Sequence, residues 1–220
     1  MALYRDTAVV LRTYKLGEAD RIVVLMTRGR GKVRAVAKGV RKTKSRFGAR
    51  LEPTSHVNLQ LYEGRGDLDI VTQAESVEPF RAIRGSLGKL ERAVAMLEVV
   101  DQVAQEGEAN EELYGMLVGG LRTVEHRDSP LVTTAFFLKR LAVEGVGVFV
   151  DGCFQCGRED SLGSIDLADG GLRCADHPGA TAVSPNAVVR LQQILGGQLA
   201  WALDQPVTPE VFAVDHLAHV

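Results

Sequence analysis

Residues 7–38 read TAVVLRTYKLGEADRIVVLMTRGRGKVRAVAK, and they contain the strongest strand signals of the chain. Runs rich in β-branched and aliphatic residues alternate here with turns that contain glycine, a pattern that predicts β-strands. With the continuation of the chain, five such runs are found: 7–13, 22–27, 32–38, 57–62 and 68–72. Five short strands within one small domain favour a closed barrel. The OB fold is the commonest barrel of this size, and an SH3-like barrel is the alternative.

The chain changes character at about residue 85, where apolar residues begin to recur at steps of three and four, which predicts helices. The first two predicted helices cover about 90–104 and 113–124, the second of them after an Asn110 cap. Three more are predicted to start at a Ser or Thr followed by proline, which suits the N-cap and first helical positions. These starts are Ser129-Pro130, Ser184-Pro185 and Thr208-Pro209.

Composition and charge restrict the functional classes. The chain has 220 residues and a net charge of -2, but residues 1–80 carry 15 Lys+Arg against 9 Asp+Glu, and the remaining residues carry 11 against 19. The first part is therefore basic and the rest acidic, which suggests that one module meets an acidic polymer. No apolar run of bilayer length and no signal-peptide pattern is present in the sequence, so we expect a cytoplasmic protein without a membrane partner.

A cysteine-rich segment at 151–180 separates the third and fourth predicted helices. It contains Cys153-x-x-Cys156, 17 intervening residues, and then Cys174-x-x-His177. Each of these two motifs, called metal hooks below, places two ligands on one tight turn. Together they supply four ligands for a tetrahedral ion, which predicts one structural zinc in a ribbon-like finger with a hairpin turn at 169–171. Asp176 is the alternative fourth ligand. Small buried cysteines or a redox C-x-x-C would leave the second hook unexplained.

A basic segment at 28–50 contains ten Lys+Arg and no acidic residue. We expect it to form one positive surface along a strand and its following loop, which would bind phosphates with strong salt dependence. Phe47 either stacks a base or anchors the loop on the barrel core. The candidate DNA-binding residues are Arg28, Arg30, Lys32, Arg34, Lys38, Arg41, Lys42, Lys44, Arg46, Phe47 and Arg50.

Residues 9–68, VVLRTYKLGEADRIVVLMTRGRGKVRAVAKGVRKTKSRFGARLEPTSHVNLQLYEGRGDL, followed by helices and a C-x-x-C insert, resemble the RecO family of bacterial DNA repair proteins. The most specific parts are 17–22, Gly39 and 46–48. The resemblance implies an α+β multidomain protein with an OB domain at 1–80, a helical domain at 81–150 and 181–220, and a zinc finger insert at 151–180. Many relatives have Cys where this chain has His177.

The same resemblance implies a non-catalytic role in DNA repair and recombination. Members of the family bind single- and double-stranded DNA, anneal complementary strands, and work with RecR, and in some lineages RecF, to load RecA onto DNA coated by single-strand-binding protein (SSB). The acidic SSB tail is implied to dock on the helical domain, where Lys139 and Arg140 are candidates to receive it. No catalytic motif and no small-molecule substrate are expected. The rival hypotheses are a zinc-ribbon transcription or translation factor and a nuclease with an unrecognised site.

Overall fold

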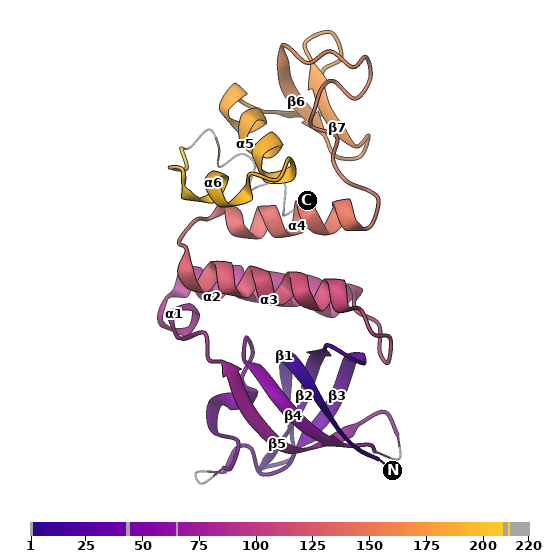
Figure 1. The fold of residues 1–220 in the computed structure, drawn as a ribbon, viewed down its shortest axis with the longest axis vertical. Helices are drawn as coiled ribbons and strands as arrows, with labels where there is room; N and C mark the ends of the chain where they lie inside the picture. Colours follow the sequence, from indigo (N-terminus) through magenta and orange to yellow (C-terminus); the bar gives the residue numbers. More distant parts are fainter. Residues whose placement is uncertain (1, 43–44, 65, 209–210, 212–220) are drawn as a thin grey trace. The chain divides into compact units, whose positions relative to one another are not determined.

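The computed structural model describes residues 2–42, 45–64, 66–208 and 211. It divides into two compact units, residues 1–126 and 127–220 (Figure 1). The first unit contains the barrel and three helices, and the second contains the remaining helices and the cysteine-rich segment. None of the described helices has the length and apolar character needed to cross a membrane. The finer division into three domains remains a prediction.

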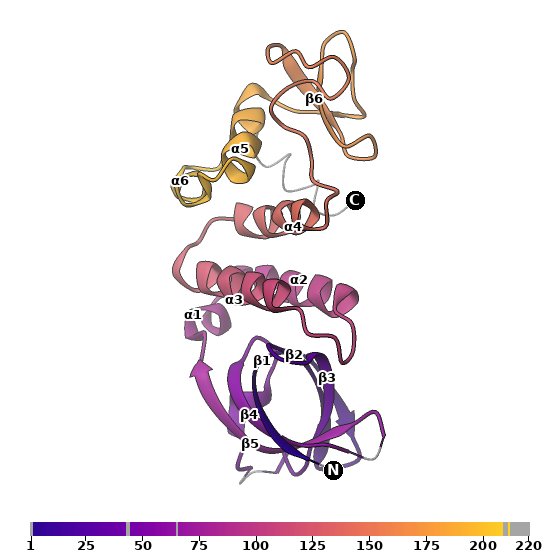
Figure 2. The same cartoon turned by 45° about the vertical axis from the view of Figure 1, so that its right-hand side comes forward.

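The N-terminal barrel is confirmed. Its strands are β1 (Leu3–Leu16), β2 (Asp20–Thr27), β3 (Gly31–Ala37), β4 (His56–Tyr62) and β5 (Asp69–Glu78). They close in the order β1-β2-β3-β5-β4, and β3 and β5 pair in parallel while the other pairs are antiparallel. Figure 2 looks into the resulting ring. This five-stranded barrel with helices C-terminal to it is the fold class that the sequence predicted.

The barrel core explains why the β3–β4 loop is held in place. Alternate strand residues, such as Val10, Leu25 and Leu61, fill the interior and are fully buried or nearly so. The loop contributes two more side chains, Phe47 and Leu51, which flank and end the short 3-10 helix η1 (Gly48–Leu51). Exposing these two large apolar side chains to water would cost free energy, so this end of the loop stays packed on the barrel. The basic residues beside them are therefore held close to the barrel.

Three helices complete the first unit: α1 (Arg81–Gly85), α2 (Leu87–Val103) and α3 (Glu111–His126). The Asn110 cap is confirmed, because Leu113 N donates to Asn110 Oδ1 at 2.9 Å. A buried histidine of β4 ties the barrel to α3. His56 Nδ1 lies 2.8 Å from Glu78 Oε2, and His56 Nε2 lies 2.7 Å from the Tyr114 hydroxyl.

The second unit consists of α4 (Leu131–Val143), a small sheet, α5 (Pro185–Leu195) and α6 (Leu199–Asp204). The sheet strands β6 (Leu162–Asp166), β7 (Gly171–Cys174) and β8 (Thr181–Ala182) lie in the order β7-β6-β8. Sheet and helices share one core. Its members include Leu138, Ile165, Leu172, Leu191 and Ala202. The finger is therefore packed on the helices of its own unit.

Helix starts show where local patterns succeed and fail. Ser184 caps α5 as predicted, since its Oγ accepts from Ala187 N at 3.1 Å. Ser129 does not cap α4: the helix begins after Pro130, and the buried Ser129 Oγ has no hydrogen-bond partner within the described chain. The predicted start at Thr208-Pro209 reaches Pro209, which lies outside the described residues. The short helices α1 and α6 were not predicted.

Candidate nucleic-acid interface and metal centre

Strand β3 presents its basic residues on the outer wall of the barrel. Ala35 and Ala37 are buried in the interior, whereas Lys32 and Arg34 lie on the opposite, outward face. Gly31 must be glycine, because its φ is +65° and an added Cβ would meet the Glu108 backbone oxygen at 1.8 Å. The close approach of the α2–α3 connection at this point places acidic residues next to the start of the strand.

The first two cations of the basic segment are paired with carboxylates from α3 and from the residue that follows β4. Arg28 Nε lies 3.2 Å from Glu111 Oε1, and Arg30 Nη1 lies 3.2 Å from Glu63 Oε1. Arg30 also stacks over the Tyr4 ring, with its guanidinium carbon 3.8 Å from the ring centroid.

Lys32 is the most enclosed of these cations. Its side chain is 17% exposed, and its Nζ donates to the Asp101 carbonyl at 2.6 Å and lies 3.8 Å from the Asp101 carboxylate. Lys32 therefore serves to attach β3 to α2.

The second part of the segment is different, because its cations are exposed and contact only backbone oxygens or an aromatic ring. Arg41 Nη1 donates to the Glu18 carbonyl at 3.0 Å, Arg50 Nη1 donates to the Arg46 and Phe47 carbonyls at 3.2 Å each, and the Arg46 guanidinium lies 4.8 Å from the Phe47 ring centroid. Lys44 lies outside the described residues. The exposed loop cations are Lys38, Arg41, Lys42, Arg46 and Arg50, and within the described chain none of them forms an ion pair.

Two features fix the path of this loop. Its entry turns at Gly39, whose φ is +68° and whose N donates to Asp20 Oδ1 at 2.7 Å. Its exit is anchored by Phe47, which is 1% exposed and belongs to the barrel core. The core-anchor alternative for Phe47 agrees with this burial, and base stacking, which would need an exposed ring face, stays an untested prediction.

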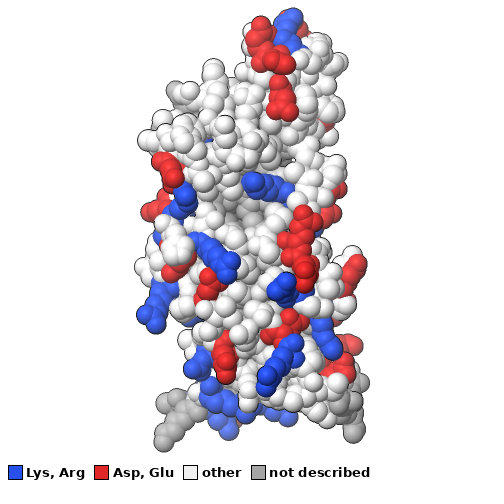
Figure 3. Space-filling model, viewed as in Figure 1, with Lys and Arg blue, Asp and Glu red and all other residues white. Residues whose placement is uncertain are grey.

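Figure 3 shows the charge distribution that results on one face of the molecule. Lys and Arg atoms gather at the lower end of the barrel in this view, whereas blue and red atoms alternate over the part of the first unit above it. The sequence predicted one positive surface along the strand and its loop. Among the described residues of the segment, the cations that are exposed and have no ion pair all lie on the β3–β4 loop.

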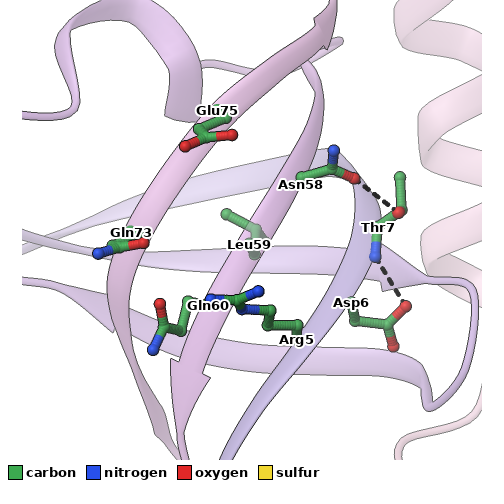
Figure 4. A pocket seen from close by; sticks show the side chains of 8 residues that line it. All are labelled: Arg5, Asp6, Thr7, Asn58, Leu59, Gln60, Gln73 and Glu75. Carbon is green, nitrogen blue, oxygen red and sulfur yellow. Dashed lines mark hydrogen bonds between the residues drawn. The ribbon is translucent and has the colours of Figure 1, made fainter.

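A second wall of the barrel carries a polar depression of about 490 Å3 that sequence reasoning missed (Figure 4). Its lining comes from β1, β4 and β5. The residues are Arg5, Asp6, Thr7, Asn58, Leu59, Gln60, Gln73 and Glu75. One cation against two carboxylates makes this wall a poor phosphate site, unlike the β3–β4 loop. The outward alternation of Asn58 with Gln60 was the available sequence signal.

The metal hooks converge in the second unit. Cys153 and Cys156 lie in the turn before β6, and Cys174 and His177 lie at the end of β7, across the predicted hairpin turn. The four ligand atoms lie within 4.8 Å of one another. Cys156 Sγ is 3.8 Å from Cys174 Sγ, and His177 Nδ1 is 3.5 Å from Cys174 Sγ and 4.0 Å from Cys153 Sγ.

These separations suit a tetrahedral ion. Two sulfurs each bound at about 2.3 Å in tetrahedral geometry lie roughly 3.8 Å apart. Burial raises the pKa of Cys153, but backbone hydrogen bonds, the largest from Cys174, outweigh it and lower the pKa to about 6. A thiolate is the form that binds a metal. Asp176 belongs to a different contact, because its carboxylate accepts from Arg158 Nη1 at 2.6 Å.

The predicted acceptor of an acidic tail on α4 needs correction. Arg140 is 8% exposed and forms an ion pair with Glu144 one turn along the helix. Its buried side chain is not available to a flexible partner at the surface. Lys139 is half-buried.

Comparison with known proteins covers almost the whole chain. The family model "Recombination protein O N terminal" matches residues 1–80, and "Recombination protein O C terminal" matches residues 84–214. The chain is 45% identical over 214 residues to "DNA repair protein RecO" of Nocardioides sp., which covers 93% of this chain and 86% of that protein. The protein of the same name from Streptomyces griseus is 42% identical over 214 residues, covering 92% and 86%. The chain therefore belongs to the RecO family of DNA repair proteins.

Proposed function

We propose that the barrel binds DNA through the exposed loop cations of the β3–β4 loop. The observation that carries this proposal is that Lys38, Arg41, Lys42, Arg46 and Arg50 are exposed without a carboxylate partner among the described residues. A phosphate backbone releases condensed counterions to such a surface, and this release supplies affinity that does not depend on base sequence. The burial of Phe47 and Leu51 in the barrel core anchors the end of the loop that carries Arg46 and Arg50.

The same surface supports strand annealing without a catalytic step. Two complementary strands repel each other through their phosphates, and a cationic surface that binds both lowers this repulsion. Base pairing then supplies the free energy of the reaction. On this view the chain is not an enzyme, and its contribution is to bring strands together.

In the cell we place this activity in recombinational repair, a role supported by the RecO family membership. The chain would act with RecR, and with RecF in some lineages, to help load RecA onto single-stranded DNA coated by SSB. Contact with the acidic SSB tail is assigned to the second unit. Lys139 remains the candidate residue there, since Arg140 is buried.

The metal of the second unit is proposed to be a single structural zinc. The four protein ligands Cys153, Cys156, Cys174 and His177 fill a tetrahedral shell, and a filled shell has no position for substrate or water. When bound, the ion would cross-link the turn before β6 to the end of β7. Metal analysis of purified protein should find one zinc per chain, and a well-folded sample with far less would contradict the assignment.

Annealing of complementary oligonucleotides tests the function directly. A variant with Lys38, Arg41, Lys42 and Lys44 changed to Ala should anneal naked strands at least about tenfold more slowly, because four phosphate contacts are removed. A thermal unfolding curve that matches the unchanged protein is the control for folding. Equal annealing by the variant would place the DNA-binding surface elsewhere.

The same assay separates the rival functions. A transcription or translation factor would bind nucleic acid but would neither speed annealing nor overcome inhibition by SSB. A nuclease would cut labelled DNA in the presence of magnesium or manganese, and such cleavage products would contradict the non-catalytic proposal.

A further inference from the structure

A cleft on the side of the barrel continues the basic loop toward α1. It has a volume of about 320 Å3 and lies between η1, the end of β5 and the first helix. Its lining residues are Gly48, Ala49, Arg50, Ser55, Ser76, Glu78, Pro79 and Arg84. Two arginines from separate elements therefore line one cleft, and one of them, Arg84, lies outside the basic segment of the sequence.

Arg84 is held in a fixed position by the helix that carries it. The neighbouring Ile83 is completely buried, and the amides of Ala82 and Ile83 each donate to the Glu125 carboxylate at 3.0 Å. The Arg84 side chain is oriented by one further bond, from Nη2 to Ser55 Oγ at 2.5 Å. This contact is neutral, so the charge of Arg84 is not compensated by it.

Arg50 is oriented in a similar way on the other side of the cleft. Its Nη1 donates to two carbonyls of its own turn, and neither Arg50 nor Arg84 forms an ion pair within the described part of the chain. A guanidinium has five N–H donors, so each arginine keeps donors for a further ligand. The cleft thus offers two preoriented cations with unused donors.

The one carboxylate of the lining is already engaged. Glu78 Oε1 accepts from Arg122 Nε at 2.7 Å, and Glu78 Oε2 lies 2.8 Å from His56 Nδ1. The Arg122 hydrogen bond holds the pKa of Glu78 below its usual value, so Glu78 stays ionised and stays bound to Arg122. The negative charge of Glu78 is therefore compensated by Arg122, which does not line the cleft.

We propose that this cleft binds one phosphodiester of a DNA strand that lies on the β3–β4 loop, with Arg50 and Arg84 as its ligands. Planar guanidinium groups suit phosphate oxygens because they donate two parallel hydrogen bonds. Arg50 belongs to both the loop and the cleft, and so links the two parts of the path. The inference rests on the proposed DNA-binding function and extends its surface from the loop to α1.

The test compares two arginines of the same short helix. Arg84→Ala removes a cleft residue, and Arg81→Ala removes an exposed arginine that does not line the cleft. Binding of a fluorescent single-stranded oligonucleotide is measured over a range of salt concentrations. We expect Arg84→Ala to reduce the log-log salt slope by about 0.7 and the affinity by about tenfold, and Arg81→Ala to leave the slope nearly unchanged.

Two further variants separate phosphate binding from a structural role. Ser55→Ala breaks the bond that orients Arg84 but keeps the cation, so the slope should be retained. Arg84→Lys keeps the charge without the planar fork, and should recover the slope but only part of the affinity. Equal slopes for Arg84→Ala and Arg81→Ala, or loss of slope in Ser55→Ala with a lowered unfolding temperature, would overturn the inference.

Free phosphate is the other source of the same chemistry. If inorganic phosphate stabilises the unchanged protein against heat through Arg84 while the DNA salt slope does not depend on Arg84, the assignment to DNA is wrong. The loop variant of the annealing assay keeps the two proposals distinguishable. A reduced slope in the loop variant alone contradicts the cleft proposal, and a reduced slope in Arg84→Ala alone contradicts the loop proposal.

Discussion

The basic segment at 28–50 and the cysteine-rich segment at 151–180 are both dense in candidate functional residues. Folding brings those of the cysteine-rich segment together and separates those of the basic segment. The four ligand residues of the second segment converge until their donor atoms lie within 4.8 Å of one another. Eight of the ten cations of the first segment fall into two groups: Arg28, Arg30 and Lys32 are paired with carboxylates, and Lys38, Arg41, Lys42, Arg46 and Arg50 are exposed on the β3–β4 loop.

The contrast has a physical cause. Each C-x-x-[C/H] hook places two ligands on one tight turn, and a single hairpin brings the hooks together, so sequence spacing nearly fixes the geometry. A run of like charges has no such internal constraint. Each of its members takes the nearest carboxylate, carbonyl or solvent that the rest of the fold provides.

The largest expected effect comes from removing a metal ligand of the cysteine-rich segment at 151–180. Cys174→Ser should remove the metal and abolish the cooperative thermal transition of the second unit, because structural zinc contributes about 10 kcal/mol or more to the folding of small zinc sites. Zinc analysis and calorimetry measure both changes. Asp176→Asn is the matched control, since Asp176 contacts Arg158 and not the cysteines, and it should keep zinc and stability. Loss of zinc in the control would make Asp176 a ligand.

The next largest expected effect is on the stability of the first unit and comes from Phe47, which anchors the β3–β4 loop in the barrel core. Phe47→Ala should lower the free energy of unfolding of the first unit by about 3–5 kcal/mol, because a buried aromatic side chain leaves a cavity. Phe47→Leu should cost much less and bind DNA with unchanged affinity. Chemical denaturation and oligonucleotide binding provide the measurements. Reduced DNA affinity in a stable Phe47→Leu protein would favour the base-stacking hypothesis over the core anchor.

A smaller effect should separate the two groups within the basic segment. The double variant Lys38→Ala/Arg41→Ala should lower the salt slope of single-strand binding by about 1.4, as two phosphate contacts are lost. Arg28→Ala/Arg30→Ala removes the same charge but should change the slope by much less, because each arginine lies beside a carboxylate that repels phosphate. Equal changes would show that pairing does not matter and that the whole segment acts as one surface.

The smallest effect is expected at Lys32, whose ammonium attaches β3 to α2. Lys32→Ala should lower the free energy of unfolding of the first unit by about 1–2 kcal/mol, through the lost hydrogen bond to Asp101 and lost packing of the stem. Its salt slope should not change. A variant with full stability and a reduced slope would return Lys32 to the DNA-binding group.

Much of the fold was predictable because its signals are local. The five strands follow from β-branched runs between glycine turns, α2 and α3 follow from apolar spacing of three and four, and α4 and α5 follow from the Ser-Pro pairs that precede them. The helices α1 and α6 have five and six residues, too short for a periodic pattern. In α1, the amides of Ala82 and Ile83 in the first turn donate to Glu125 of α3, a tertiary contact that no local pattern predicts.

The amino-acid sequence was sufficient for the five strands, the four longer helices and the three cysteines of the metal site, since each depends on spacing between residues that are close along the chain. The fold alone settled which cations are exposed, that Phe47 is a core residue, and that Arg84 shares a cleft with Arg50. These outcomes depend on contacts between residues far apart in sequence, such as Lys32 with Asp101 and Arg84 with Ser55. A local sequence pattern does not predict such contacts, because burial and pairing depend on which distant residues pack together in the folded protein.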